Sequence, residues 1–391
     1  MKKSLAFLLS IILCAAFFAA CSATQNIDYS DTYIFGQDSQ ENYIRYQSQR
    51  YFAESKDSYF FLSTDNGFLY SIDKATHICR PLCNKSNCLH DREASFASKN
   101  ECNAFINTMY ESIVYYDGSL YYAVDDEDVD NDGVAVYLRK IIKLPLDGSA
   151  RETVYETKDY ELSNFKIHRG YIYYEGARKN PDGATDLMRD RTLMKVPVSG
   201  GKEEELLPYY KHQDAYINDA RFYGNHIFLW VEKPKKTDIE YYLINYDLQT
   251  NKYENLSEKL EVNIDSMFTV FNDKLIFANG SKVYECDLDG SNQKEVLDCM
   301  GVVDGYKYYT PFTHDGEHLI ISIGNDDRNS NKLIFCNKEY KPTVYELSME
   351  YQAVIGFDKN AFLYYDSDDC ALNLIDKTNF KTEKIYNFPD N

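Results

Sequence analysis

The chain has few of the features that mark a nucleic-acid-binding or membrane-spanning protein. Basic side chains are in the minority, with 42 Lys and Arg against 62 Asp and Glu. The resulting net charge of −20 repels polyanions, which argues against nucleic acid as a partner. No stretch beyond residue 20 approaches 18 consecutive apolar residues, so we expect no later segment to span a bilayer.

Catalytic sequence signatures are also missing. The chain contains no G-x-S-x-G elbow, no H-E-x-x-H pair and no phosphate-binding loop. Its seven histidines are scattered, and with 62 acids some carboxylate pair would always look suited to glycoside chemistry, so we nominate no catalytic residue. We expect a non-catalytic binding or scaffolding protein. A glycan-active hydrolase or lyase and a metal-binding surface protein are the alternatives.

Helical periodicity is nearly absent, and the 36 tyrosines and 22 phenylalanines favour strands. One unit recurs seven times, in which a polar turn precedes a short apolar or aromatic strand. The strand centres follow one another at intervals of 43 to 61 residues: Tyr59, Leu120, Ile172, Ile227, Leu275, Leu319 and Phe362. Such a period indicates a repeat architecture.

Each unit also has a second half. Residues 142–148 and 152–155 show its pattern, a strand that ends in a turn and then a shorter strand, and residues 164–168 show a further strand upstream of the unit. Four strands per unit and seven units predict an all-β fold, a β-propeller of about seven four-stranded blades over residues 44–391. Two stacked β-sandwiches would not require near-equal repeats. An eighth partial blade, with a strand at 32–35, and the strand that closes the ring stay open.

The longest loops are expected between the second and third strands of a blade, at residues 125–133, 176–190, 232–238 and 324–331. In a propeller these connections share one face, which is where a binding surface would most readily form.

The first 20 residues have the pattern of a signal peptide. Lys2 and Lys3 precede an apolar stretch of fewer than 18 residues that ends in small side chains. The sequence Phe18-Ala19-Ala20-Cys21 resembles the bacterial lipobox, with Phe where Leu is usual. The resemblance implies that Cys21 becomes the lipid-bearing N-terminus, acylated with fatty acids such as palmitate. The protein would then be anchored to the outer, extracytoplasmic face of the cell membrane. An ordinary signal peptide with an incidental cysteine is the alternative. Residues 21–43 are polar, and we expect them to form a flexible tether.

The repeats resemble those of TolB-like and low-density-lipoprotein-receptor-like propellers found in bacterial lipoproteins. The resemblance rests on the Gly/Asp-x-apolar-Tyr-Tyr strand and the apolar-Asp-x-x-Gly/Asn turn, over residues 55–388. Many members of those families bind or scaffold, which implies an unidentified protein, peptide or glycan as the partner. Fold alone supports this function only weakly.

A cysteine-rich insert is expected at residues 79–105, between the first and second blades. Its candidate ligands follow the pattern C-x3-C-x4-C-x-H-x11-C: Cys79, Cys83, Cys88, His90 and Cys102. The insert resembles one in propeller lipoproteins of Gram-positive anaerobes. Clustered cysteines outside the cytoplasm favour two disulfides, whereas thiolates with an imidazole suit a structural zinc ion. Free thiols are the remaining alternative. The other cysteines of the propeller, at 286, 299, 336 and 370, are expected as buried apolar residues.

One acidic loop matches the start of a calcium-binding loop. Asp128, Asp130 and Asp132 alternate before Gly133, as oxygen ligands for a hard cation do. Position 12 of the pattern is Arg139 rather than a bidentate Glu, which excludes an EF-hand. A looser calcium loop and a solvated hairpin tip both remain open.

Overall fold

The structure is a computed structural model, and it describes most of the chain after residue 26. The described residues are 27–43, 51–63, 66–90, 95–107, 112–129, 135–158, 162, 165–177, 191–206, 216–235, 239–261, 268–303, 308–309, 313–324, 330–346, 354–366 and 369–388. Cys21 and the signal-peptide pattern lie outside them. Within the described part, no helix combines the length and the apolar character needed to cross a bilayer.

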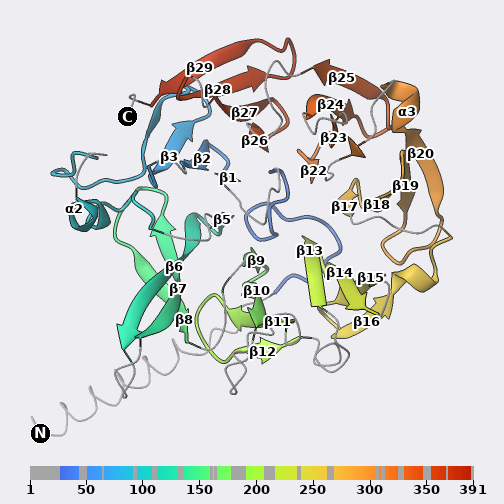
Figure 1. The fold of residues 1–391 in the computed structure, drawn as a ribbon, viewed down its shortest axis with the longest axis horizontal. Coiled ribbons are helices and arrows are strands. Elements are labelled where there is room, and N and C mark those ends of the chain that lie inside the picture. Colours follow the sequence, from blue (N-terminus) through green and yellow to red (C-terminus); the bar gives the residue numbers. More distant parts are fainter. Residues whose placement is uncertain are drawn as a thin grey trace, which may run out of the picture.

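The fold is a seven-bladed β-propeller, which confirms the prediction. Seven antiparallel sheets stand around a common centre (Figure 1), each built from strands consecutive in the sequence. In the sixth blade, two short strands share the innermost position and both pair with β23.

The strands of each blade run from the innermost to the outermost in chain order. The first four blades are β1 (Phe52–Glu54), β2 (Ser58–Leu62), β3 (Leu69–Asp73) and β4 (Cys79–Pro81); β5 (Ile113–Tyr116), β6 (Ser119–Val129), β7 (Ala135–Pro145) and β8 (Glu152–Thr157); β9 (Lys166–His168), β10 (Tyr171–Ala177), β11 (Arg191–Pro197) and β12 (Glu204–Glu205); β13 (Tyr216–Tyr223), β14 (His226–Pro234), β15 (Ile239–Asp247) and β16 (Lys252–Asn255).

The last three blades are β17 (Phe268–Phe271), β18 (Lys274–Asn279), β19 (Lys282–Cys286) and β20 (Lys294–Asp298); β21 (Tyr308–Tyr309), β22 (Thr313–His314), β23 (Leu319–Gly324), β24 (Ser330–Cys336) and β25 (Pro342–Glu346); β26 (Val354–Phe357), β27 (Ala361–Asp366), β28 (Ala371–Asp376) and β29 (Thr382–Asn387). Short helices are α2 (Phe96–Asn100), α3 (Cys299–Val302) and the 3-10 helix η2 (Leu256–Glu258).

The second strand of a blade is apolar on both faces because each face packs against a neighbouring blade. In β2, Tyr59 and Phe61 belong to the cluster shared with the seventh blade, whereas Phe60 and Leu62 belong to the cluster shared with the second. Successive side chains of a strand point to opposite faces, so an unbroken apolar run serves two interfaces at once. Seven such clusters bury the seven blade interfaces.

The connections divide between the two faces of the ring as expected. The first and second strands of a blade join through tight turns, which we call the A–B turns; Asp117 and Gly118 form one of them, with φ of 42° and 73°. The loops expected at 125–133, 176–190, 232–238 and 324–331 fall between second and third strands, which confirms their place in the blade. Strands β6 and β7 extend into the first of these loops.

In the described part of the chain, the first and last blades exchange no strand where the ring closes. Gly356 of β26 packs so closely on Phe52 of β1 that a Cβ would come within 2.1 Å of the ring. Tyr59 donates its hydroxyl to Asp358 at 2.6 Å, and Tyr43 forms an isolated bridge with Gly356. Packing and side-chain hydrogen bonds therefore hold the closure, and residues 32–35 form no strand.

The expected tether at residues 21–43 is wrong for its described part. Residues 38 to 43 are all buried at the centre of the ring (Figure 1). Asp38 contacts Arg169 after β9, Glu41 contacts Lys166 at the start of β9, and Tyr43 reaches β26, so the segment runs down the axis along the innermost strands. Residues 27–43, which we call the plug segment, are part of the propeller, because its polar groups find partners there.

Candidate functional site

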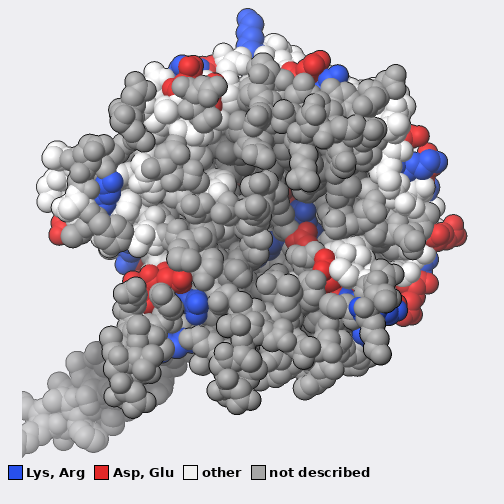
Figure 2. All heavy atoms as spheres, in the orientation of Figure 1, with Lys and Arg blue, Asp and Glu red and all other residues white. Residues whose placement is uncertain are grey.

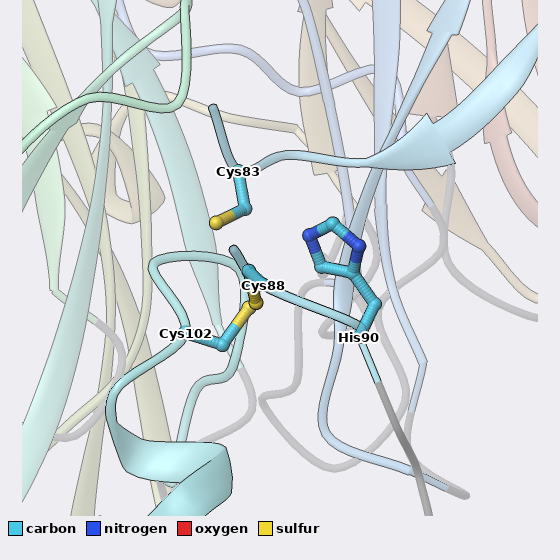
Figure 3. A group of neighbouring side chains, drawn as sticks. All are labelled: Cys83, Cys88, His90 and Cys102. Carbon is cyan, nitrogen blue, oxygen red and sulfur yellow. The ribbon is translucent and has the colours of Figure 1, made fainter. Parts of the chain in front are cut away.

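Four of the five predicted ligands of the cysteine-rich insert come together. The sulfurs of Cys83, Cys88 and Cys102 and a ring nitrogen of His90 lie within 4.8 Å of one another. Figure 3 shows the three sulfurs on one side and the imidazole turned toward them. This group can hold a metal ion, and we call it the Cys/His group.

The approach to the group is fixed by a tight contact between the first two blades. Beyond β4, the backbone of Cys83 packs on the turn between β7 and β8, where a Cβ on Gly148 would lie 2.8 Å from it. Gly148, at φ +71°, also accepts a hydrogen bond from Asn84 N–H at 3.2 Å. A turn from Lys85 then brings in Cys88. Because only glycine fits this contact, Cys83 is anchored to the second blade.

Cys102 is brought in from the other end of the insert. Helix α2 begins at the N-cap Ser95, and the Cys102 N–H bonds to Lys99 O at 2.9 Å just beyond its end. Arg151 from the second blade donates to the carbonyl of Cys102. Asn103 Nδ2 donates to Gly148 O at 2.9 Å. The group therefore joins the insert to both blades.

The four groups differ in electrostatic state. Burial disfavours the thiolate of Cys83, but the N–H groups of Lys85 and Asn103 and the neighbouring His90 and Cys102 outweigh it and lower its pKa to about 6. Burial raises the pKa of Cys102 to about 12. His90 has φ of 52°, and its buried Nε2 has no hydrogen-bond partner. A buried ring nitrogen that has no hydrogen-bond partner and lies beside three sulfurs is a position that a metal ion would satisfy.

The remaining cysteines stand apart from the group. Cys79 lies in β4, so the insert begins at residue 82 rather than 79. Burial raises the pKa of the Cys79 thiol to about 12. None of the eight cysteines after Cys21 forms a disulfide in the structure. Cys286, Cys299 and Cys336 are buried as expected, whereas Cys370 is half buried.

The candidate calcium loop falls only partly within the described residues. Asp128 lies in β6, opposite Val136 of β7. Asp130 and Asp132 fall outside the described part of the chain, and calcium binding there stays a prediction.

A second set of functional groups, which the sequence analysis missed, surrounds the plug segment. Arg169 donates from Nε to Asp38 Oδ1 at 2.7 Å and from Nη2 to Asp38 Oδ2 at 3.3 Å, with both side chains almost fully buried. The neighbouring His168 accepts the Ser39 N–H at Nδ1 (3.2 Å), and its Nε2 lies 2.8 Å from Gly224 O. The plug segment is thus held at Asp38 by an ion pair and at Ser39 by a neutral imidazole.

Deeper in the ring, Glu41 forms a second buried charge cluster. Its two oxygens lie 2.9 Å from Lys166 Nζ and 2.9 Å from Arg221 Nη1. Its carbonyl accepts the hydroxyl of Thr313. These partners come from the third, fourth and sixth blades, and acidic and basic side chains are visible together at the centre of the disc in Figure 2.

A sequence signal for this network existed. At the same turn position as Arg169 (φ 44°), other blades have Asp117, Gly224 and Asn272, also with positive φ. Arginine in this conformation is uncommon, whereas Gly, Asn and Asp tolerate it. A basic residue at a site that favours small polar ones indicates a selected contact.

Beside the plug segment is a pocket of about 290 Å³, lined by Tyr33 and Phe35 of that segment and, among others, by residues of blades five and six. Four carboxylates line it: Glu41, Glu54, Asp273 and Asp315. A pocket of this size suits a small ligand, and convergent carboxylates are the feature that a glycan-active site would need.

Each of these carboxylates already has an internal partner. Beyond Glu41, the partners are Lys74 for Glu54, Tyr223 for Asp273, and His318 with Lys377 for Asp315. Burial raises the pKa of Glu54 against the opposing effect of Lys74. Burial also opposes ionisation of Asp315, but its two partners outweigh it and lower the pKa to about 2. These pairs stabilise the ring before any ligand arrives.

Comparison with known proteins adds similarity of fold. Neither the family models nor the curated proteins gave a match. Among solved structures, the chain is similar to the uncharacterized protein lmo1340 from Listeria monocytogenes (14% identity, 69% of this chain and 81% of that chain, TM-score 0.45). It is also similar to TolB from Acinetobacter baumannii (11% identity, 85% of this chain and 77% of that chain, TM-score 0.35). A third similar structure is oligogalacturonate lyase from Vibrio parahaemolyticus (9% identity, 82% of this chain and 91% of that chain, TM-score 0.41). The propeller assignment itself rests on the sheet order of this chain.

Proposed function

We propose that this protein is a lipid-anchored lipoprotein on the extracytoplasmic face of the cell membrane, where its propeller acts as a non-catalytic binding scaffold for a protein, peptide or glycan. The carrying observation is the plugged axis. In a glycoside hydrolase, an acid and a second carboxylate must face the substrate, whereas each carboxylate of the pocket beside the plug segment is matched by a cation or hydrogen-bond donor of the chain itself. The lipobox resemblance at Cys21 and the repeat fold support the anchor and the scaffold.

The anchor and the missing chemistry are tested together. The parent protein is expected in the membrane fraction with an acylated Cys21 at its N-terminus, and Cys21→Ser in the soluble fraction, because stable anchoring needs the acyl chains. Purified protein is expected to show no turnover on oligogalacturonate, other glycans or peptides. An unmodified mature N-terminus would overturn the anchor, and turnover on any of these substrates would overturn the non-catalytic role.

We also propose that the Cys/His group holds a structural zinc ion. Three sulfurs and one imidazole nitrogen complete a four-coordinate shell, which is typical of structural rather than catalytic zinc. The unpaired His90 Nε2 is the observation that favours a metal over a disulfide, since a disulfide would leave this nitrogen unsatisfied. Zinc would join the insert to the first two blades, a role comparable to that of a disulfide.

Protein purified without chelators is expected to carry about one zinc ion per chain. Cys88→Ser and His90→Ala should each lose most of the metal, because each removes one of four ligands, and chelation of the parent should lower its melting temperature. Cys370→Ser removes a half-buried cysteine outside the group and should keep the metal. Metal-free parent protein, or a disulfide among Cys83, Cys88 and Cys102 found by peptide mapping, would contradict zinc binding.

A further inference from the structure

We propose that the face of the propeller that carries the A–B turns lies against the lipid bilayer, so that the loops between second and third strands point away from it. This inference rests on the proposed lipid anchor at Cys21. It concerns which surface of the scaffold is free to meet a partner.

Before it enters the ring, the plug segment runs along the face that carries the A–B turns. Arg169, in an A–B turn, donates to the carbonyls of Asp28, Ser30 and Thr32, the last two at 2.7 Å. Asp31 packs on Gly224, in the corresponding turn of the next blade, where a Cβ would approach its backbone to 2.6 Å. The segment is therefore held on this face before it turns into the axis.

Further contacts extend this attachment across three blades. Asp31 Oδ1 lies 3.2 Å from Nε2 of His226, the first residue of β14. The Gly36 carbonyl accepts the N–H of Asp117, in the A–B turn of the second blade, at 2.8 Å. Because the segment is fixed at the second, third and fourth blades, its N-terminal end cannot move to the opposite face without breaking these bonds.

The proposed anchor is close to the plug segment in the sequence. Six residue steps separate Cys21 from Ile27, and even a fully extended chain of that length reaches only about 20 Å. Strand β15 runs nine residues across the ring, which corresponds to about 27 Å between its faces. The short connection thus restricts the acylated cysteine to the face on which Ile27 lies.

The plug segment also exposes aromatic side chains. Three aromatic side chains of the plug segment are exposed within seven residues: Tyr29 at 39%, Tyr33 at 38% and Phe35 at 46%. Tyr33 is supported by Tyr223 (ring centroids 6.4 Å apart) and Phe35 by Tyr115 (5.8 Å), so the rings are held in place while exposed. Aromatic side chains concentrate at membrane–water interfaces. A lipid surface is the occupant that both the anchor and these rings fit.

Tryptophan fluorescence in vesicles tests the orientation. Trp230, the only tryptophan, is buried at 2% exposure and is replaced by Phe. Into this background we place Phe35→Trp on the proposed membrane face or, as the matched control, Ile239→Trp. Ile239 is similarly exposed (42%) but begins β15 after a loop of the opposite face. The lipidated proteins are reconstituted into phosphatidylcholine vesicles with brominated acyl chains.

The emission maximum of the Phe35→Trp protein is expected to lie to the blue of that of the Ile239→Trp protein. Its intensity should be about twofold lower in brominated than in unbrominated vesicles, whereas the intensity of the Ile239→Trp protein should be the same in both. A lipidated Phe35→Trp protein without quenching, or quenching of the Ile239→Trp protein instead, would overturn the orientation and leave the anchor intact. If mass analysis of the same sample finds no acylated Cys21, the proposed anchor fails, and this inference falls with it.

Discussion

Replacing Arg169 with Met is expected to destabilise the protein by about 3–5 kcal/mol, the largest single effect that we predict. The substitution leaves the buried Asp38 carboxylate without its cation and removes the donor to three carbonyls of the plug segment. An uncompensated buried charge costs more than a lost surface pair, since no water can replace the missing partner. Urea unfolding monitored by circular dichroism measures the loss, and limited proteolysis should show earlier cleavage within residues 27–43.

The control is Lys282→Met, which breaks an ion pair of similar length. Lys282 lies 2.7 Å from Glu295, but both side chains are over 40% exposed, so the loss is expected to stay below about 1 kcal/mol. Asp38→Asn combined with Arg169→Met removes the stranded charge and should recover part of the loss. If Arg169→Met costs no more than Lys282→Met, the ion pair does not hold the plug.

The propeller could be predicted from sequence because its blades use local rules. Each blade is contiguous, its second strand is a short apolar or aromatic run, and in the first six blades the turns carry glycine, aspartate or asparagine at positive φ. The runs around Tyr59 and Leu120 are apolar at consecutive positions because both faces are buried. These signals repeat within each blade and need no knowledge of distant contacts.

The plug segment escaped prediction because its partners are far away in the chain. Residues 38–43 are mostly polar, which in isolation is typical of a solvated linker. The free-energy cost of burying their carboxylates is offset by ion pairs with Arg169, Lys166 and Arg221, more than 100 residues later in the chain. Pairings at such separations follow from the closed ring, which a local pattern does not specify.

The Cys/His group was predicted in part for a related reason. The sequence spacing identified five candidate ligands, and because they lie close together in the sequence, we expected them to meet. It could not separate Cys79 from the rest, because that depends on where β4 ends and the insert begins. The orphaned Nε2 of His90 is likewise visible only in three dimensions.

Acidification from pH 6.5 to pH 4 is expected to cost about 3 kcal/mol of unfolding free energy through His168 alone. Complete burial lowers the pKa of His168 to about 4 from 6.5, despite the opposing effect of nearby Asp38. Between these values the unfolded chain binds a proton that the folded protein does not. The contribution is therefore fully present above pH 6.5, is lost as the pH falls, and changes no further below pH 4.

The geometry explains why the folded state excludes this proton. Nδ1 of His168 accepts the Ser39 N–H, so protonation there would set two donors against each other, and the adjacent Arg169 adds a like charge. Burial lowers the pKa of His314 as well, so His314 also makes the unfolding free energy fall with decreasing pH. The profile of the parent alone would therefore not separate the contributions of the two histidines. His168→Gln keeps a polar side chain without a titrating group and should make the profile between pH 6.5 and 4 less steep, with the contribution of His314 remaining.

The matched control is Phe222→Leu, which thins the packing on the His168 ring (centroids 5.3 Å apart) without removing a proton site. It should lower stability by a similar amount at every pH and keep the slope of the parent. Urea midpoints measured at half-unit pH intervals for the three proteins separate packing from titration. If the unfolding free energy of His168→Gln falls with pH as steeply as that of the parent, then His168 contributes no proton to the slope and other groups cause the loss of stability.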